Sequence, residues 1–236
     1  MAGRTYRRAD SSFLLSTAAE QQAKTLQENA ERKKYRITGA HTTRPIEDMR
    51  MVKRWMDIAR EHDAHRINQG VSWYMLLLLG FNTGLRISDI CKLRVKDIRG
   101  RERVTGLAQK TDKDYNVKFQ KPVQKYFEQE LKGRDGDDYI LASRQRDRIT
   151  GEQRPISRQR AYCIVKKIAT MAGYQEHVGC HTMRKTFAFR FYKASNGDLA
   201  KLQKILRHDS TEVTLHYLGL DQQTLDDVVD NMPTFL

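Results

Sequence analysis

Residues 202–218 read LQKILRHDSTEVTLHYL, and this stretch decides the fold. The capping-box spacing that starts at Asp209 predicts a short helix over about Ser210–Leu218. Taken alone, the stretch has an ordinary explanation. His208 follows a helix, where its charge would offset the helix dipole. Tyr217 lies among apolar residues, and a single tyrosine in such a helix is more often part of a core.

Two segments further upstream carry residues of the same kind. Residues 83–89 read TGLRISD and place Arg86 after a glycine turn, while residues 181–184 read HTMR. His181 and Arg184 are three residues apart, so they share a face if the segment is helical. Taken alone, Arg86 would be interpreted as a solvated surface residue, and most pairs like His181 and Arg184 have no catalytic role.

The order of these residues changes that interpretation. An Arg, then His-x-x-Arg, then a His, then a Tyr nine residues later closely resembles the active-site signature of the tyrosine recombinase (phage integrase) family. The resemblance covers about residues 44–220. It implies the fold of that family's catalytic domain, which is mainly α with a small antiparallel β-sheet (α+β). It also implies a DNA strand transferase that cuts and rejoins strands through a covalent 3′-phosphotyrosyl intermediate.

The resemblance assigns a role to each residue of the signature. Two guanidiniums can clamp the non-bridging oxygens of a phosphodiester and neutralise the charge that grows in the transition state. Arg86 and Arg184 take that role. Tyr217 is the nucleophile. His181 accepts its proton or hydrogen-bonds the phosphate, and His208 donates to a non-bridging oxygen.

The leaving 5′ oxygen needs a proton, which the family takes from a lysine in a β-hairpin. Residues 109–113 read QKTDK and lie in a predicted hairpin turn, so Lys110 matches best and Lys113 is the alternative. Seen alone, either lysine would be a solvated turn residue. Asp89 follows the first Arg by three residues, and we expect it to hold an arginine or a helix end.

The rest of the chain predicts mostly helices. Pro45 is expected as a first helical residue, with Thr42 and Thr43 as candidate caps. The further predicted elements are a helix over about Gln69–Asn82, strands at Val95–Ile98, Val104–Ala108 and Val117–Phe119, a helix over Pro122–Lys132, a basic loop over Ser143–Arg160, and helices over Ser157–Met171, Thr182–Lys193 and Asp198–Arg207.

Three domains are expected. Residues 1–40 form a basic helical N-terminal arm, and residues 41–220 form the catalytic domain. Residues 221–236 form an acidic C-terminal helix with an apolar stripe. By resemblance this helix is exchanged between protomers, and folding back on its own domain is the alternative. Most family members carry a helical core-binding domain before the catalytic one, whereas about 40 residues precede it here.

The net charge of +14 and the pI of about 9.8 favour a polyanion as partner. Four acidic residues and no Lys or Arg follow Gly219, so the positive charge lies in the rest of the chain. The candidate DNA-binding residues are a loop cluster and the start of a helix that the family places in the major groove: Arg144, Arg146, Arg148, Arg158 and Arg160. A merely solvated basic loop is the alternative.

Other classes of site find no support in the sequence. The three cysteines are widely spaced and suggest neither a disulfide framework nor zinc. Acidic residues do not cluster as in a magnesium site, and no Gly-rich phosphate loop is present. The N-terminus has no apolar signal segment, and the longest apolar run, Met75–Leu79, is too short to span a bilayer. We therefore expect no metal, cofactor, small-molecule substrate or membrane.

The expected partners are double-stranded DNA and further copies of the chain, from a dimer to a tetrameric synapse. The expected location is the cytoplasm, associated with the nucleoid, in a bacterium, phage or mobile element. Two alternatives stay open. A type IB topoisomerase shares the chemistry but relaxes DNA alone, and the TGLR segment argues against it. A non-catalytic DNA-binding regulator could lose the active-site residues, which are all present here.

Overall fold

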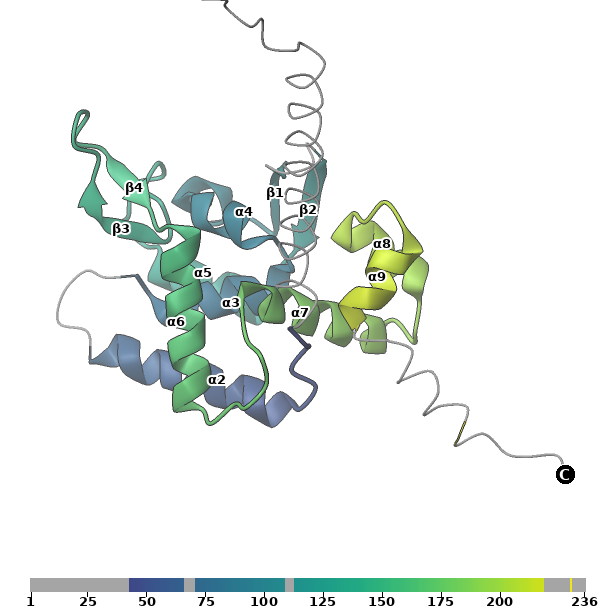
Figure 1. The fold of residues 1–236 in the computed structure, drawn as a ribbon. Coiled ribbons are helices and arrows are strands. Elements are labelled where there is room, and N and C mark those ends of the chain that lie inside the picture. The colour runs from purple at the N-terminus through teal and green to yellow at the C-terminus, as the bar shows by residue number, and fades with distance from the viewer. Residues whose placement is uncertain (1–42, 66–70, 109–112, 219–229, 231–236) are drawn as a thin grey trace, which may run out of the picture. The chain divides into compact units, whose positions relative to one another are not determined.

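The computed structural model describes residues 43–65, 71–108, 113–218 and residue 230, which belong to one compact unit beginning at Thr43 (Figure 1). The predicted N-terminal arm lies outside the described residues. So does the predicted acidic C-terminal helix, apart from Asp230.

Eight α-helices, one 3₁₀-helix and four strands make up the described part of the chain. In order they are α2 (Met49–Ala64), α3 (Trp73–Thr83), α4 (Ile87–Lys92), η1 (Val95–Asp97), β1 (Arg103–Leu107), β2 (Asp114–Lys118), α5 (Lys121–Glu130), β3 (Ala142–Arg146), β4 (Gln153–Pro155), α6 (Arg158–Met171), α7 (Cys180–Ala194), α8 (Leu199–Leu206) and α9 (Thr211–Leu218).

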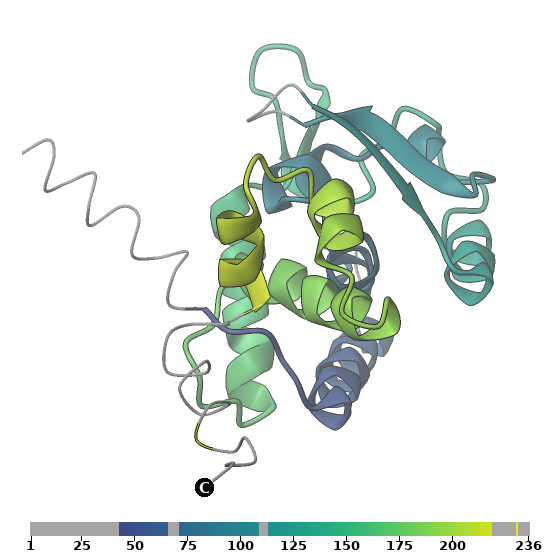
Figure 2. The same ribbon diagram turned by 90° about the vertical axis from the view of Figure 1, so that its right-hand side faces the viewer.

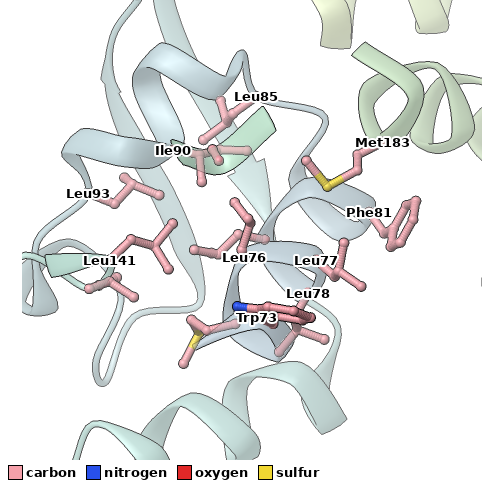
Figure 3. Close-up of a cluster of buried hydrophobic side chains, with 14 of the residues drawn as sticks. Trp73, Leu76, Leu77, Leu78, Phe81, Leu85, Ile90, Leu93, Leu141 and Met183 are labelled. Atoms are coloured by element: carbon pink, nitrogen blue, oxygen red, sulfur yellow. The ribbon is translucent and has the colours of Figure 1, made fainter. Parts of the chain in front are cut away.

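Helix α3 lies at the centre of the unit. Its N-cap Ser72 accepts a hydrogen bond of 3.0 Å from the backbone N–H of Met75. Nine of its eleven residues are buried, because α2 and α7 both pack against it. Figure 3 shows its apolar side chains meeting those of neighbouring segments, among them Leu141 and Met183. A helix that is apolar on all sides belongs in a core.

A glycine lets α7 approach α3 closely. A Cβ added at Gly80 would lie 2.5 Å from the Sδ atom of Met183, so no larger residue fits without a shift. Met183 is buried, and Arg184 follows it in the chain. The close crossing therefore brings the HTMR segment to the end of α3, where the TGLR segment begins.

The strands form two separate antiparallel pairs. In β1–β2, Val104 pairs with Val117 and Gly106 with Tyr115, and the buried residues of β2 alternate with exposed ones. The strand predictions at 104–108 and 117–119 are thus confirmed within a few residues. The second pair, β3–β4, projects from the body of the unit in Figure 1. The predicted class, mainly α with little antiparallel sheet, is confirmed.

Three local predictions were wrong. No helix begins at Pro45: the N–H of Ile46 donates to Thr186 Oγ1 at 2.8 Å, which holds this segment extended along α7, and α2 starts only after its cap, Asp48. Residues 95–97 form a 3₁₀-helix because the carboxylate of Asp97 accepts from the N–H of Arg94 at 2.8 Å. The basic loop expected over residues 143–160, whose end overlaps the helix expected from Ser157, contains most of the β3–β4 hairpin instead.

Helices α7, α8 and α9 form the end of the unit that faces the viewer in Figure 2. A small second core of Ala188, Leu202, Leu206 and Leu218 joins them. Asp198 caps α8 by accepting from the N–H of Lys201 at 2.9 Å. Among the described helices, none combines the length and apolar character that a membrane crossing requires.

Candidate active site

Arg184 lies at the centre of the candidate site. It is 2% exposed, on the first turns of α7. Its guanidinium donates to the carbonyl of Gly84 at the end of α3 and, at 2.8 Å, to the carbonyl of Leu206 at the end of α8. Burial lowers the pKa of Arg184 to about 10, the phenol of Tyr217 opposes that shift, and the charge of Arg86 adds to it. The side chain remains a cation at pH 7.

Gly84 turns the chain from α3 toward Arg86. It caps α3 with φ of 62°, in the left-handed region that favours glycine. A Cβ there would lie 2.2 Å from the ring of Phe187 on α7. Arg86 follows in extended backbone as the N-cap of α4. Its Nη1 is buried and has no hydrogen-bond partner among the described residues.

His208 follows α8 and is 9% exposed. Its Nδ1 lies 3.1 Å from Thr214 Oγ1, and that hydroxyl donates to the carbonyl of Ser210 at 3.2 Å. Nη2 of Arg184 lies 3.4 Å from its Nε2. Because Arg184 can only donate, these contacts assign the ring proton to Nδ1. Burial, and then the charges of Arg184 and Arg86, lower the pKa of His208 to about 4, so the ring is neutral at pH 7.

Tyr217 lies on α9, half-buried, with its ring against the same groups. Its ring centroid is 4.5 Å from that of His208 and 5.5 Å from Cζ of Arg184. Nζ of Lys185 lies 5.9 Å from the centroid. The structure therefore gathers Arg184, His208 and Tyr217 from three separate segments of the chain, with the charge of Arg86 acting on the first two of them.

The remaining predicted residues lie around this cluster. His181 is the second residue of α7 and is exposed. Lys110 lies outside the described residues. Lys113, the alternative, forms an ion pair with Asp209, the neighbour of His208. Asp89 is 4% exposed on α4, and its charge favours the protonated form of Arg207. The roles assigned to these residues remain predictions.

Sequence reasoning missed three residues that belong to this cluster. Lys185 is 2% exposed although it is a lysine, and burial, followed by the charge of Arg44, lowers its pKa. Thr214 holds the His208 ring. Arg207 lies beside His208 in the chain. Lys185 and Arg207 each adjoin a signature residue, and that adjacency was the only signal available, since neither residue type is unusual in a basic protein.

A basic cleft lies elsewhere on the unit. It has a volume of about 740 Å³ and is lined by Arg144 of β3, Arg154 of β4 and Arg160 of α6, with His62 and Trp73 among its other lining residues. The cleft thus joins two of the predicted DNA-binding residues with Arg154, which was not predicted. Arg146, Arg148 and Arg158 are exposed near them in the chain.

The chain matches the model of the phage integrase family over residues 50–224. It is 31% identical over 184 residues to a probable integrase/recombinase, YoeC, of Bacillus subtilis, which covers 78% of this chain and 93% of YoeC. The XerA recombinase structure aligns with a TM-score of 0.59 at 23% identity, over 81% of this chain and 67% of XerA.

A second solved structure is XerH site-specific recombinase bound to palindromic difH substrate in a post-cleavage complex. It aligns with a TM-score of 0.56 at 20% identity, over 80% of this chain and 53% of XerH. The chain spans about half the length of several bacterial tyrosine recombinases that it also matches. The fold is that of a tyrosine recombinase catalytic domain.

Proposed function

The chain belongs to the phage integrase family of tyrosine recombinases, which are DNA strand transferases, and from this we propose that it recombines specific DNA sites through a covalent bond between Tyr217 and a 3′ phosphate. The observation that carries the proposal is the meeting of Arg184, His208 and Tyr217 in one cluster, beside Arg86. Neither a topoisomerase nor a regulator is favoured by the relatives.

In the proposed step, the phenolic oxygen of Tyr217 attacks the scissile phosphorus. A P–O bond to tyrosine forms, and the bond from phosphorus to the 5′ oxygen breaks. The phenolic proton passes to His181, and the leaving 5′ oxygen takes a proton from Lys110 or Lys113. One phosphodiester replaces another, so a 5′ hydroxyl of a second strand can reverse the step and rejoin the DNA.

Arg86 and Arg184 stabilise the charge that develops on the non-bridging oxygens. His208 can donate to one of these oxygens only with a proton on Nε2, whereas its contacts here place the ring proton on Nδ1. A bound phosphate would draw the Arg184 guanidinium away from Nε2 and favour that proton. We therefore propose that the ring proton of His208 moves from Nδ1 to Nε2 when DNA binds.

The partners follow from the same proposal. Double-stranded DNA is the substrate, and the XerH complex with difH supports it. We propose that two copies bind one site and that four form the synapse. We also propose that the chain acts in the cytoplasm, at the nucleoid, and that it derives from a bacterium, phage or mobile element. Its relatives are bacterial.

A nicked suicide substrate tests the proposal. Duplexes from the DNA that flanks the gene, nicked beside the cleaved phosphate, should trap the wild-type protein as a covalent adduct on a denaturing gel. Tyr217→Phe should form no adduct, because phenylalanine has no nucleophilic oxygen. Tyr192→Phe, a half-buried tyrosine of α7, is the matched control and should react normally. An adduct with Tyr217→Phe would mean that another residue is the nucleophile.

A further inference from the structure

The backbone of Arg207 is in a conformation that suits glycine. Arg207 ends α8 with φ of 56° and ψ of 44°. Among the described non-glycine residues, only Asn196 shares a positive φ, and asparagine tolerates that region better than most residues do. A long side chain at such a position adds strain that glycine would avoid. Strain of this kind is typically retained where the side chain serves a function.

The side chain of Arg207 is held in one place without satisfying its donors. Its Cζ lies 5.3 Å from the centroid of the Tyr115 ring on β2, a cation–π contact that fixes the guanidinium. Its Nε and Nη1 are buried and have no hydrogen-bond partner within the described part of the chain. Buried donors without partners cost free energy, so the fold alone does not explain this arrangement.

Two other arginines of the site share this property. Nη1 of Arg86 and Nε of Arg184 are also buried without a hydrogen-bond partner in the described ranges. The charges of these three guanidiniums act on one another: burial, and then Arg86, lower the pKa of Arg207, and Arg207 in turn lowers that of Arg184. An oxyanion at this place would accept hydrogen bonds from the unused donors and would offset the repulsion between the three positive charges.

We propose that Arg207 is a third phosphate-binding arginine, which contacts the scissile phosphate together with Arg86 and Arg184. The inference rests on the proposed strand-transfer function. Asp89 is the carboxylate whose charge favours the protonated Arg207. Three guanidiniums and the Lys185 ammonium outnumber this one carboxylate, with His208 neutral. A phosphodiester carries one negative charge and the pentavalent transition state carries two, so a third arginine can stabilise the charge that develops during the reaction.

The competing explanation is structural. Arg207 could serve only to hold α8 against β2 through Tyr115, as the ion pair between Lys113 and Asp209 does nearby. The two explanations differ in what happens when the side chain is removed. If Arg207 is only a structural contact, removing its side chain would lower the stability of the fold, and cleavage would fall only as a consequence. If Arg207 binds the phosphate, removing its side chain would lower the cleavage rate without a loss of stability.

The first experiment uses Arg207→Gly with Asn196→Gly as the matched control. Both variants relieve a left-handed backbone, so Tm should stay level or rise, by about 2–4 °C at most. Single-turnover cleavage of the suicide substrate should fall about 100-fold in Arg207→Gly, the usual effect of losing one oxyanion donor. Asn196→Gly should cleave at the wild-type rate. A fall of less than threefold in Arg207→Gly overturns the proposal.

The second experiment uses a substrate with a methylphosphonate at the cleaved position, which removes one oxygen and its charge. If Arg207 neutralises that charge, the loss caused by Arg207→Gly should shrink to a fewfold on at least one diastereomer. If Arg207→Gly loses as much activity on both methylphosphonate diastereomers as on the natural phosphodiester, Arg207 acts through structure and the proposal is overturned.

A third measurement separates the two hypotheses. If the wild type forms no adduct on any duplex, strand transfer by Tyr217 fails. Binding of inorganic phosphate, titrated by calorimetry, then still tests Arg207: Arg207→Gly should weaken it at least tenfold and Asn196→Gly should not. Equal affinities would overturn the role of Arg207, whether or not the protein cleaves DNA.

Discussion

Burial beside arginines keeps His208 neutral, and this gives a pH dependence that belongs to a single residue. Its pKa is about 4 in the folded chain, against 6.5 for an ordinary histidine. Between these values the unfolded chain binds a proton that the folded one does not, so stability is full above pH 6.5 and falls as the pH drops through 4. The contribution lost is about 3 kcal/mol.

His208→Asn tests this dependence, because its amide nitrogen can replace Nδ1 as donor to Thr214. The free energy of unfolding, from urea titrations at pH 7 and pH 4.5, should fall less with pH in the variant than in the wild type. His65→Asn, at the exposed end of α2, controls for the loss of a histidine. A wild-type slope in His208→Asn would contradict the burial of a neutral ring at this position.

At the scale of elements, Gly84 decides how α3 meets α7. Gly84→Ala should lose about 2–4 kcal/mol, since alanine at a positive φ is strained and its Cβ meets the Phe187 ring. The shift also moves the carbonyl that Arg184 donates to, so cleavage should fall as well. Thermal unfolding and suicide-substrate cleavage measure the two effects.

Gly173→Ala is the matched control. Gly173 follows α6 with φ of 72°, and a Cβ there would meet nothing within 4 Å among the described residues. Only the backbone strain should appear, about 1 kcal/mol, with cleavage unchanged. If both variants lose equally, the contact with Phe187 does not determine the packing of α3 on α7.

Prediction from sequence succeeded where elements have a buried face or a capping side chain. Helix α6 was placed correctly because Ser157 caps it and its apolar residues repeat with a helical period. The β3–β4 hairpin was missed because none of its strand residues is buried, so no alternation of buried and exposed positions marks it. Its turn is instead held by Asp147, which accepts from the N–H groups of Ile149 and Thr150.

The candidate site shows the same division. Arg86, His181, Arg184, His208 and Tyr217 could be found because a known order of residues carries them. Arg207 could not, because its significance lies in a left-handed backbone and in unused donors, neither of which leaves a mark in the sequence. The contact of Thr214 with His208 depends on how α9 packs on α8, and local patterns do not determine that packing.

For the whole molecule, the basic cleft between β3, β4 and α6 predicts how DNA affinity depends on salt. Arg144→Gln and Arg160→Gln should each reduce the slope of log affinity against log salt by about 1, if each side chain contacts one phosphate. Lys132→Gln, an exposed charge outside the cleft, is matched in charge and should leave the slope unchanged. Fluorescence anisotropy over a range of salt measures it. Equal slopes in all three variants would mean that DNA does not occupy the cleft.

Arg184 donates to carbonyls at the ends of both α3 and α8, so the proposed phosphate ligand also closes the fold. Selection for activity and selection for a stable fold therefore both favour keeping Arg184. A copy whose target DNA has disappeared from its host no longer needs the chemistry, but losing this arginine would still remove hydrogen bonds that join α7 to the ends of α3 and α8. Among copies that have lost their activity, Arg184 should therefore be among the last signature residues to change, so its presence alone would be weak evidence that a copy is still active.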